Sequence, residues 1–230
     1  MTAIESSNPQ PPVLSKKPRW MSVKHAHHFR SHTDEFDACK IGMWLFLTTE
    51  VLLFSGLFVA YAMFRMKYPE AFANGSHYLD WRWGALNTAV LLLSSFTVAW
   101  SIRNAQLNQQ GLLKFNLAFT ILCAIAFIAI KFNFEYIPKW ADGKRPGVLF
   151  AYPFAENNAE VLWWSIYYTA TGIHAAHVVI GAALIGWVFI KATRGHYGPK
   201  HYTGVEVVGL YWHLVDLIWI FLFPLLYLIH

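Results

Sequence analysis

Long apolar runs separated by short polar connectors dominate the sequence. Beyond residue 40, charged side chains are almost absent from five stretches, at residues 41–64, 83–102, 115–130, 161–190 and 207–230. A helix needs about 20 apolar residues to cross the hydrocarbon core of a bilayer, and each stretch reaches that length with its apolar flanks. The pattern therefore predicts an all-α, polytopic membrane protein. We expect five spanning helices, at about residues 39–66, 83–107, 111–137, 159–192 and 204–229.

The N-terminal stretch differs from the rest of the chain. Residues 1–37 are polar and contain the run PQPP at 9–12, whereas residues 38–230 carry the apolar helices. No apolar segment follows a charged start, so we expect no cleavable secretory signal. The stretch is predicted to be an extended cytoplasmic tail. Four histidines in it could bind a metal, although a solvated cluster without a role is the simpler interpretation: His25, His27, His28 and His32.

Composition agrees with a membrane protein and excludes several other classes. Charged residues make up 13% of the chain, about half of the ~25% usual in soluble domains, and hydrophobic residues make up 56%. A soluble enzyme and a disordered chain are therefore excluded. Two cysteines, Cys39 and Cys123, are too few for a disulfide framework. The net charge of +5 is scattered between apolar runs, without the basic patch that nucleic-acid binding needs.

The distribution of Lys and Arg predicts the orientation. With the N-terminus inside, eleven of the 18 Lys and Arg residues fall on the inner side and seven on the outer side. Positive side chains are enriched in cytoplasmic segments. We therefore expect the N-terminus inside and, because the number of helices is odd, the C-terminus outside.

Glu50 lies near the middle of the first predicted helix. Ionisable groups at membrane depth are costly and are candidates for function. A lone carboxylate there is expected to be neutral or hydrogen-bonded to a neighbouring helix. Two interpretations stay open, a neutral carboxyl that ties two helices together and a group that handles protons.

Polar side chains also mark the last two predicted helices. His174 and His177 are three residues apart and share one helix face, and Glu206, His213 and Asp216 follow one stripe of the next helix. We expect the two stripes to pair, with His213 or Asp216 against His174 or His177. In the third helix, Lys131 and Glu135 are four residues apart, and they either pair with each other or extend towards the membrane surface.

Cofactor binding by these groups has weak support in the residues alone. His213 and one of the two preceding histidines could hold a haem between them, but nothing beyond the histidines indicates it. A di-iron bundle would need a Glu-x-x-His motif on each of two helices, and neither is present. We therefore expect no metal or haem in this chain, and a haem-anchoring membrane cytochrome stays as an alternative.

Several motifs in order resemble subunit III of the haem-copper oxidases, the cytochrome c oxidase type. The segments that carry the resemblance are GMWLF at 42–46, TEVLLFSG at 49–56, LNT at 86–88, EY at 135–136, TGIHAAHV at 171–178 and YWHLVDLIW at 211–219. Together they extend over nearly the whole membrane region. Glu50 falls on the membrane carboxylate of the family.

The resemblance implies a role within a respiratory complex. Members of the family bind no haem or copper, which belong to partner subunits, and they pack against subunit I alongside subunit II and other subunits. They bind phospholipid in a cleft between helices, and they support proton uptake and sustained turnover of the proton-translocating oxidase in aerobic electron transport. Lys191 and Arg194 are, on this basis, candidate contacts for a lipid headgroup.

The number of helices is that of a bacterial form of the family. The long form has seven helices, and this chain carries the polar tail in place of the first two. The resemblance then implies a multi-pass protein of the bacterial inner membrane, with an extended subunit I as a possible source of the two other helices. An equivalent subunit of a quinol oxidase or a nitric oxide reductase is an alternative, since those complexes carry similar five-helix chains.

Overall fold

The computed structural model describes residues 19–22, 26–27, 29–153, 155 and 159–229. Every regular element in these ranges is helical, apart from one isolated bridge between Gly198 and His201. The elements are η1 (Arg19–Ser22), α1 (His32–Lys67), α2 (Pro69–His77), α3 (Trp81–Gln106), α4 (Gln110–Ile130), η2 (Lys131–Tyr136), α5 (Ile137–Ala141), η3 (Gly147–Leu149), α6 (Glu160–Thr193) and α7 (Thr203–Tyr227).

Five of the helical segments are long and apolar enough to span a membrane, which confirms the predicted all-α, five-helix fold. They are α1, α3, the continuous segment Gln110–Ala141 formed by α4, η2 and α5, α6, and α7. The predicted and observed bounds of α6 and α7 agree to within two residues. The short helix α2 was not predicted, because it lies in a polar connector between two apolar runs.

The first helix begins earlier than the hydropathy pattern predicted. It starts at His32 rather than near residue 39, because Ser31 caps it with a side-chain oxygen that accepts from the backbone N–H of Asp34 at 3.1 Å. Asp34 and Glu35 in its first turn suit the positive end of the helix dipole. The helix therefore extends beyond the apolar run into the predicted tail. Of the tail histidines, His25 and His28 lie outside the described residues.

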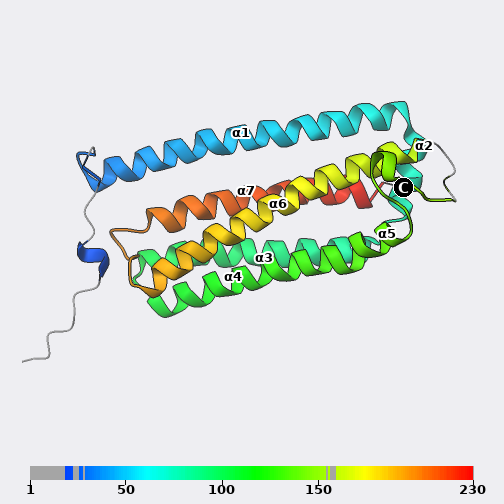
Figure 1. Ribbon diagram of the computed structural model, residues 1–230. Coiled ribbons are helices and arrows are strands. Elements are labelled where there is room, and N and C mark those ends of the chain that lie inside the picture. The colour runs from blue at the N-terminus through cyan, green and yellow to red at the C-terminus, as the bar shows by residue number, and fades with distance from the viewer. Residues whose placement is uncertain (1–18, 23–25, 28, 154, 156–158, 230) are drawn as a thin grey trace, which may run out of the picture.

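The bundle has two ends, which we call proximal, where α1 begins, and distal, where α1 ends (Figure 1). α3 and α4 form an antiparallel pair, and α7 packs against α3, α6 and α1. α1 lies along one side of the bundle, on the side away from α4 (Figure 1). Many of its large apolar side chains are exposed, among them Trp44, Leu52 and Val59.

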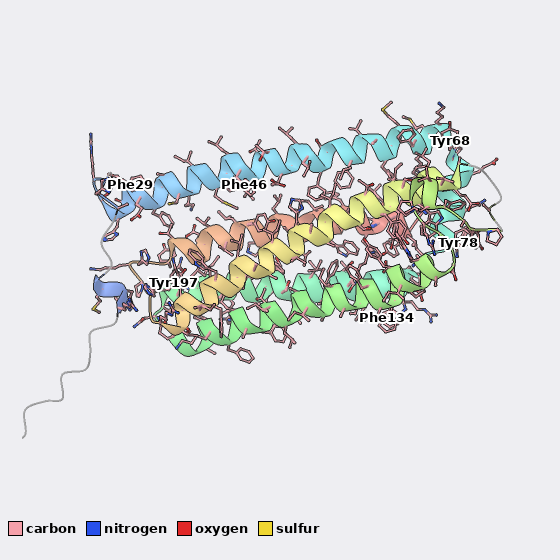
Figure 2. All side chains as sticks on the ribbon, in the orientation of Figure 1. Phe29, Phe46, Tyr68, Tyr78, Phe134 and Tyr197 are labelled. Atoms are coloured by element: carbon pink, nitrogen blue, oxygen red, sulfur yellow. The ribbon has the colours of Figure 1, made fainter. Side chains whose placement is uncertain are left out.

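Aromatic side chains fill the interior between α6, α7 and their neighbours (Figure 2). Trp163, Trp164, Tyr167, Trp212 and Trp219 are fully buried. Two of these rings, those of Trp163 and Trp212, lie against glycines of neighbouring helices. A Cβ atom at Gly181 would lie 2.7 Å from the Trp212 ring, and one at Gly75 would lie 2.1 Å from the Trp163 ring. Gly75 and Gly181 thus allow α2 and α7 to approach α6 closely.

Replacing Gly181 with alanine should weaken the packing of α6 against α7. The added methyl would overlap the buried Trp212 ring, and overpacking of this kind costs about 1–3 kcal/mol. We expect a lower free energy of unfolding for Gly181→Ala, measured by denaturing-detergent titration of the purified protein. Gly172→Ala, on the same helix, is the matched control, because no atom lies within 4 Å of a Cβ there. Equal stability of the two variants would contradict this packing argument.

Candidate functional site

Glu50 and His177 meet between α1 and α6. Glu50 Oε2 lies 2.7 Å from His177 Nε2, and both side chains are 15% exposed. The other ring nitrogen of His177, Nδ1, lies 2.7 Å from the carbonyl oxygen of Ile173. A carbonyl can only accept, so Nδ1 carries a proton. The pair then holds one further proton, either on Glu50 with a neutral imidazole or on Nε2 as imidazolium and carboxylate.

The surroundings of this pair are aromatic. The ring of Phe54 contacts the His177 imidazole edge to face, with centroids 5.2 Å apart. Tyr211 from α7 lies parallel to the imidazole and donates its hydroxyl to the His177 carbonyl at 3.3 Å. The pair is thus held by three helices. The pair stays neutral overall while the two side chains share this one proton, whereas loss of the proton would leave the Glu50 carboxylate uncompensated.

The second histidine of α6 has a different environment. His174 is fully buried, lies parallel to Trp219 at 5.1 Å and meets Phe127 edge to face at 5.6 Å. Neither of its ring nitrogens has a hydrogen-bond partner among the described residues. His174 and His177 therefore share a helix face in sequence, but the structure brings only His177 to the carboxylate of Glu50.

Two of the three polar residues of α7, His213 and Glu206, have partners other than the predicted ones. His213 Nδ1 lies 2.7 Å from the Ser95 hydroxyl on α3, and Glu206 forms an ion pair of 2.8 Å with Lys40 on α1. Asp216 is buried, and neither of its carboxyl oxygens has a partner within the described part of the chain. Spacing shows which residues share a face of one helix, but it does not show how two helices are rotated against each other. For that reason the expected pairing of the α7 residues with His174 or His177 is wrong.

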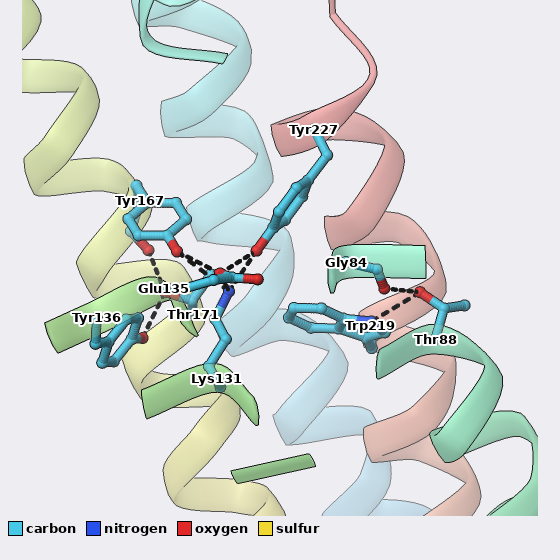
Figure 3. A network of polar contacts seen from close by, with 9 residues as sticks. All are labelled: Gly84, Thr88, Lys131, Glu135, Tyr136, Tyr167, Thr171, Trp219 and Tyr227. Atoms are coloured by element: carbon cyan, nitrogen blue, oxygen red, sulfur yellow. Dashed lines mark hydrogen bonds and ion pairs between the residues drawn. The ribbon is translucent and has the colours of Figure 1, made fainter. Parts of the chain in front are cut away.

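A buried polar network lies at the distal end. From the sequence, only the pairing of Lys131 with Glu135 was considered, as one of two alternatives, and the tyrosine partners were not predicted. Lys131 and Glu135 form an ion pair with each side chain 1% exposed, so they pair and do not extend to the surface. Tyr167 from α6 donates to Glu135 Oε2 at 2.7 Å, and Tyr227 from α7 donates to the same oxygen (Figure 3). The Lys131 ammonium also donates to the hydroxyls of Tyr167 and Tyr227. One carboxylate oxygen of η2, the turn that continues α4, therefore joins this segment to α6 and α7.

The ion pair lies in an irregular turn of the helix that begins with α4. Lys131 and Glu135 lie in η2, a π-helical turn in which the N–H of Ile137 donates to the carbonyl of Phe132. Pro138 follows directly and has no N–H to offer the preceding turn. The Lys131 ammonium lies 5.0–5.7 Å from the centroids of four aromatic rings, which favours the cation through their negative faces. These rings belong to Tyr136, Tyr167, Trp219 and Tyr227.

Two shorter polar links flank the network. The Tyr136 hydroxyl lies 2.7 Å from the Thr171 hydroxyl, which itself donates to the Tyr167 carbonyl. On the other side, the Trp219 indole N–H donates to the Thr88 hydroxyl at 3.0 Å (Figure 3). Thr88 belongs to the LNT motif at 86–88 and Trp219 to the YWHLVDLIW motif at 211–219. This hydrogen bond therefore brings the two motifs together in the structure.

A cleft of about 470 Å³ opens between α1, α6 and α7 at the proximal end. Met43 and Phe46 line it from α1, and Trp187 and Lys191 line it from α6. The Lys191 ammonium lies 3.6 Å from the centroid of the Trp187 ring. Arg194 caps the end of α6 and is exposed outside the cleft lining. Glu35, Tyr197 and His201 also line the cleft, so its lining combines apolar side chains with groups of both charges.

The described residues contain no group of three or more His, Cys, Asp or Glu side chains placed to hold a metal ion. His177 has both ring nitrogens within hydrogen-bond distance of other groups.

Removing one member of the buried ion pair should be far more damaging than removing both. Lys131→Met leaves the Glu135 carboxyl buried without its cation, and such a change costs about 3–5 kcal/mol, whereas apolar replacement of a whole pair is often close to neutral. We expect Lys131→Met to lower the free energy of unfolding strongly and Lys131→Met/Glu135→Leu to recover most of the loss. A double variant as unstable as the single one would contradict the network described here.

Comparison with known proteins agrees with this architecture. Residues 19–230 match the family model described as cytochrome c oxidase subunit III. Human cytochrome c oxidase subunit 3 is 29% identical over 196 residues, which cover 82% of this chain and 68% of the human protein. The carp (Cyprinus carpio) protein of the same name is 32% identical over 194 residues, with 82% and 68% covered.

A bacterial relative is covered more completely. The probable quinol oxidase subunit 3 of Staphylococcus haemolyticus is 30% identical over 206 residues, which cover 86% of this chain and 92% of that protein. The family match extends over all five membrane-spanning segments. It also includes the Glu50–His177 pair and the network around Lys131 and Glu135. The chain therefore belongs to the cytochrome c oxidase subunit III family of the haem-copper oxidases.

Proposed function

We propose that the chain is the non-catalytic subunit III of a proton-pumping terminal cytochrome c oxidase in a bacterial inner membrane. It packs against subunit I, and the haem and copper that reduce oxygen belong to partner subunits. Family membership and the five membrane-spanning helices support this assignment. The proximal end is assigned to the inside, because Lys191, Arg194 and Lys200 lie there and cytoplasmic segments are rich in such residues.

The observation that carries the proposed role is the contact between Glu50 and His177. A carboxyl and an imidazole 2.7 Å apart, with Nδ1 already protonated, form a site that holds a single exchangeable proton. Since this site lies midway along α1 and is partly exposed, a proton can reach it or leave it. We assign to it a part in proton uptake and in the sustained turnover of the complex.

Lipid binding is the second part of the proposal. The cleft between α1, α6 and α7 has apolar walls, and Lys191 stands at its proximal end. An acyl chain along the walls would bury apolar surface, and its phosphate would meet the ammonium of Lys191. Bound phospholipid would then fill the space that separates α1 from α6 and α7.

A quinol oxidase is the second candidate for the complex. The relative whose length this chain covers most fully of those compared above is a probable quinol oxidase subunit 3. Electron donors are bound by other subunits, so the neighbouring chains distinguish the two complexes. A copper-binding subunit II in the purified complex would indicate cytochrome c as the donor.

Glu50→Gln tests the proton-sharing role against simple packing. Glutamine keeps the size of the side chain and can hydrogen-bond to His177, but it cannot exchange a proton, whereas Glu50→Ala removes both properties. We expect single-turnover oxygen reduction to be unchanged in both variants. During prolonged turnover, both should inactivate several-fold faster than the unsubstituted complex, as followed by oxygen consumption.

Ser55→Ala is the matched control, because Ser55 lies on the same helix and donates to the backbone of that helix. A Glu50→Gln complex that is as durable as the unsubstituted one, beside a sensitive Glu50→Ala complex, would leave Glu50 with a packing role alone. Unchanged inactivation in both variants would remove any role of Glu50 in turnover.

A spectrum of the isolated chain tests whether it carries its own redox centre. We expect no haem absorbance in the visible region from the purified subunit, since the proposal assigns haem to partner subunits. A stoichiometric b-type spectrum would instead identify a haem-anchoring cytochrome and overturn the proposal.

A further inference from the structure

Another groove lies between α1 and α7, separate from the cleft at the proximal end. Its volume is about 320 Å³, within the range of about 300–1,000 Å³ that is usual for ligand pockets. It shares no lining residue with the proximal cleft. Six apolar side chains form its walls: Trp44, Leu47 and Val51 from α1, and Leu210, Leu214 and Leu217 from α7.

The groove lies at membrane depth. Its lining residues belong to the apolar stretches 41–64 and 207–230, which are long enough to cross the hydrocarbon core. From Trp44 to Val51 the wall on α1 is about 10 Å long, given the rise of an α-helix. Among the described residues, no Lys, Arg, Asp or Glu lines it. A phosphate group would therefore find no cation here, whereas an uncharged group of the size of a ring suits the space.

One polar nitrogen at this groove has no partner. His213 lines the groove, and its Nδ1 lies 2.7 Å from the hydroxyl of Ser95 on α3. Its other ring nitrogen, Nε2, is accessible and has no hydrogen-bond partner in the described part of the chain. The hydroxyl of Thr48, which also lines the groove, donates to the Trp44 carbonyl at 2.9 Å. His213 Nε2 is therefore the hydrogen-bonding group that remains for a ligand.

This nitrogen limits what can fill the groove. An acyl chain would leave Nε2 without a partner in hydrocarbon, and an unsatisfied polar group there costs free energy. A complementary ligand is thus apolar over most of its surface and carries an oxygen that can bond to imidazole. The Ser95 hydroxyl can donate to Nδ1 or accept from it, so Nε2 is either an N–H donor or an acceptor.

We propose that the groove between α1 and α7 binds the ring of a lipid-soluble quinone, with His213 Nε2 hydrogen-bonded to a ring oxygen. In the oxidised ring a carbonyl accepts from the Nε2–H, and in the reduced ring a hydroxyl donates to Nε2. The indole of Trp44 supplies an aromatic ring for the quinone to pack against. The quinone is held as a ligand and undergoes no redox step in this chain. The site goes beyond the proposed function, in which phospholipid is the small-molecule ligand.

Photolabelling of the intact complex that contains the chain tests the site. The complex is placed in phosphatidylcholine vesicles with a photoreactive azidoquinone that carries a short isoprenoid tail, and the labelled peptides are identified by mass spectrometry. We expect label on the peptides that contain residues 44–51 and 210–217. Excess decylubiquinone should prevent this labelling, because it has the same ring oxygens. Excess squalene, an isoprenoid hydrocarbon without oxygen, should not.

Two variants change the groove in different ways. His213→Leu removes the nitrogen and keeps an apolar side chain, and it should lower the labelling about fivefold, the effect of one hydrogen bond. Leu217→Trp fills the groove, keeps His213 and should abolish the labelling. Leu217 is 50% exposed, so a larger side chain there disturbs no packed core. Ile220→Trp is the matched control and should label normally, because Ile220 is an exposed residue of the same helix outside the groove lining.

Label that is spread evenly over the exposed faces of α1 and α7, or that squalene also prevents, would show partition into lipid and overturn the inference. Unchanged labelling of His213→Leu would overturn it too, since a groove that holds the label without the imidazole does not recognise a ring oxygen. Equal labelling of Leu217→Trp and Ile220→Trp would place the quinone elsewhere. Labelling is measured independently of oxygen consumption, so failure here leaves the proposed function untouched.

Discussion

Hydrocarbon offers polar groups no hydrogen-bond partner, so a polar side chain within a membrane-spanning helix needs one inside the protein. That constraint determines how these helices are joined. The Lys131 and Glu135 side chains would be very costly alone, but together with the hydroxyls of Tyr167 and Tyr227 they join η2 to α6 and α7. Apolar packing alone would not fix the rotation of these helices, because lipid tails compete with it equally.

The same constraint explains how α1 is held. Much of its apolar surface is exposed, and polar contacts tie it to the bundle at three levels. Lys40 pairs with Glu206 near the proximal end, Glu50 meets His177 midway, and the hydroxyl of Tyr61 donates to a backbone carbonyl of α7 near the distal end. The cleft between α1, α6 and α7 lies at the proximal end, close to the first of these contacts.

Much of the fold, and less of the site, could be predicted from the sequence. Five helices followed directly from the apolar runs, because the thickness of a bilayer sets their length. The start of α1 did not follow, since its first turns depend on the cap at Ser31 and not on hydropathy. Glu50 and His177 were identified as candidates, but their contact was not. It depends on the rotation of α1 against α6, which no spacing within either helix encodes.

The network around Glu135 also bears on the order in which the bundle is completed. Lys131 and Glu135 are inserted with α4 and can pair at once within their own helix. The hydroxyl of Tyr167 arrives with α6, and that of Tyr227 arrives only with the last turn of α7. Until α7 is in place, the ion pair therefore lacks one of its hydroxyl partners. The hydrogen bonds of this ion pair are complete only once the helices that carry Glu135, Tyr167 and Tyr227 are packed together.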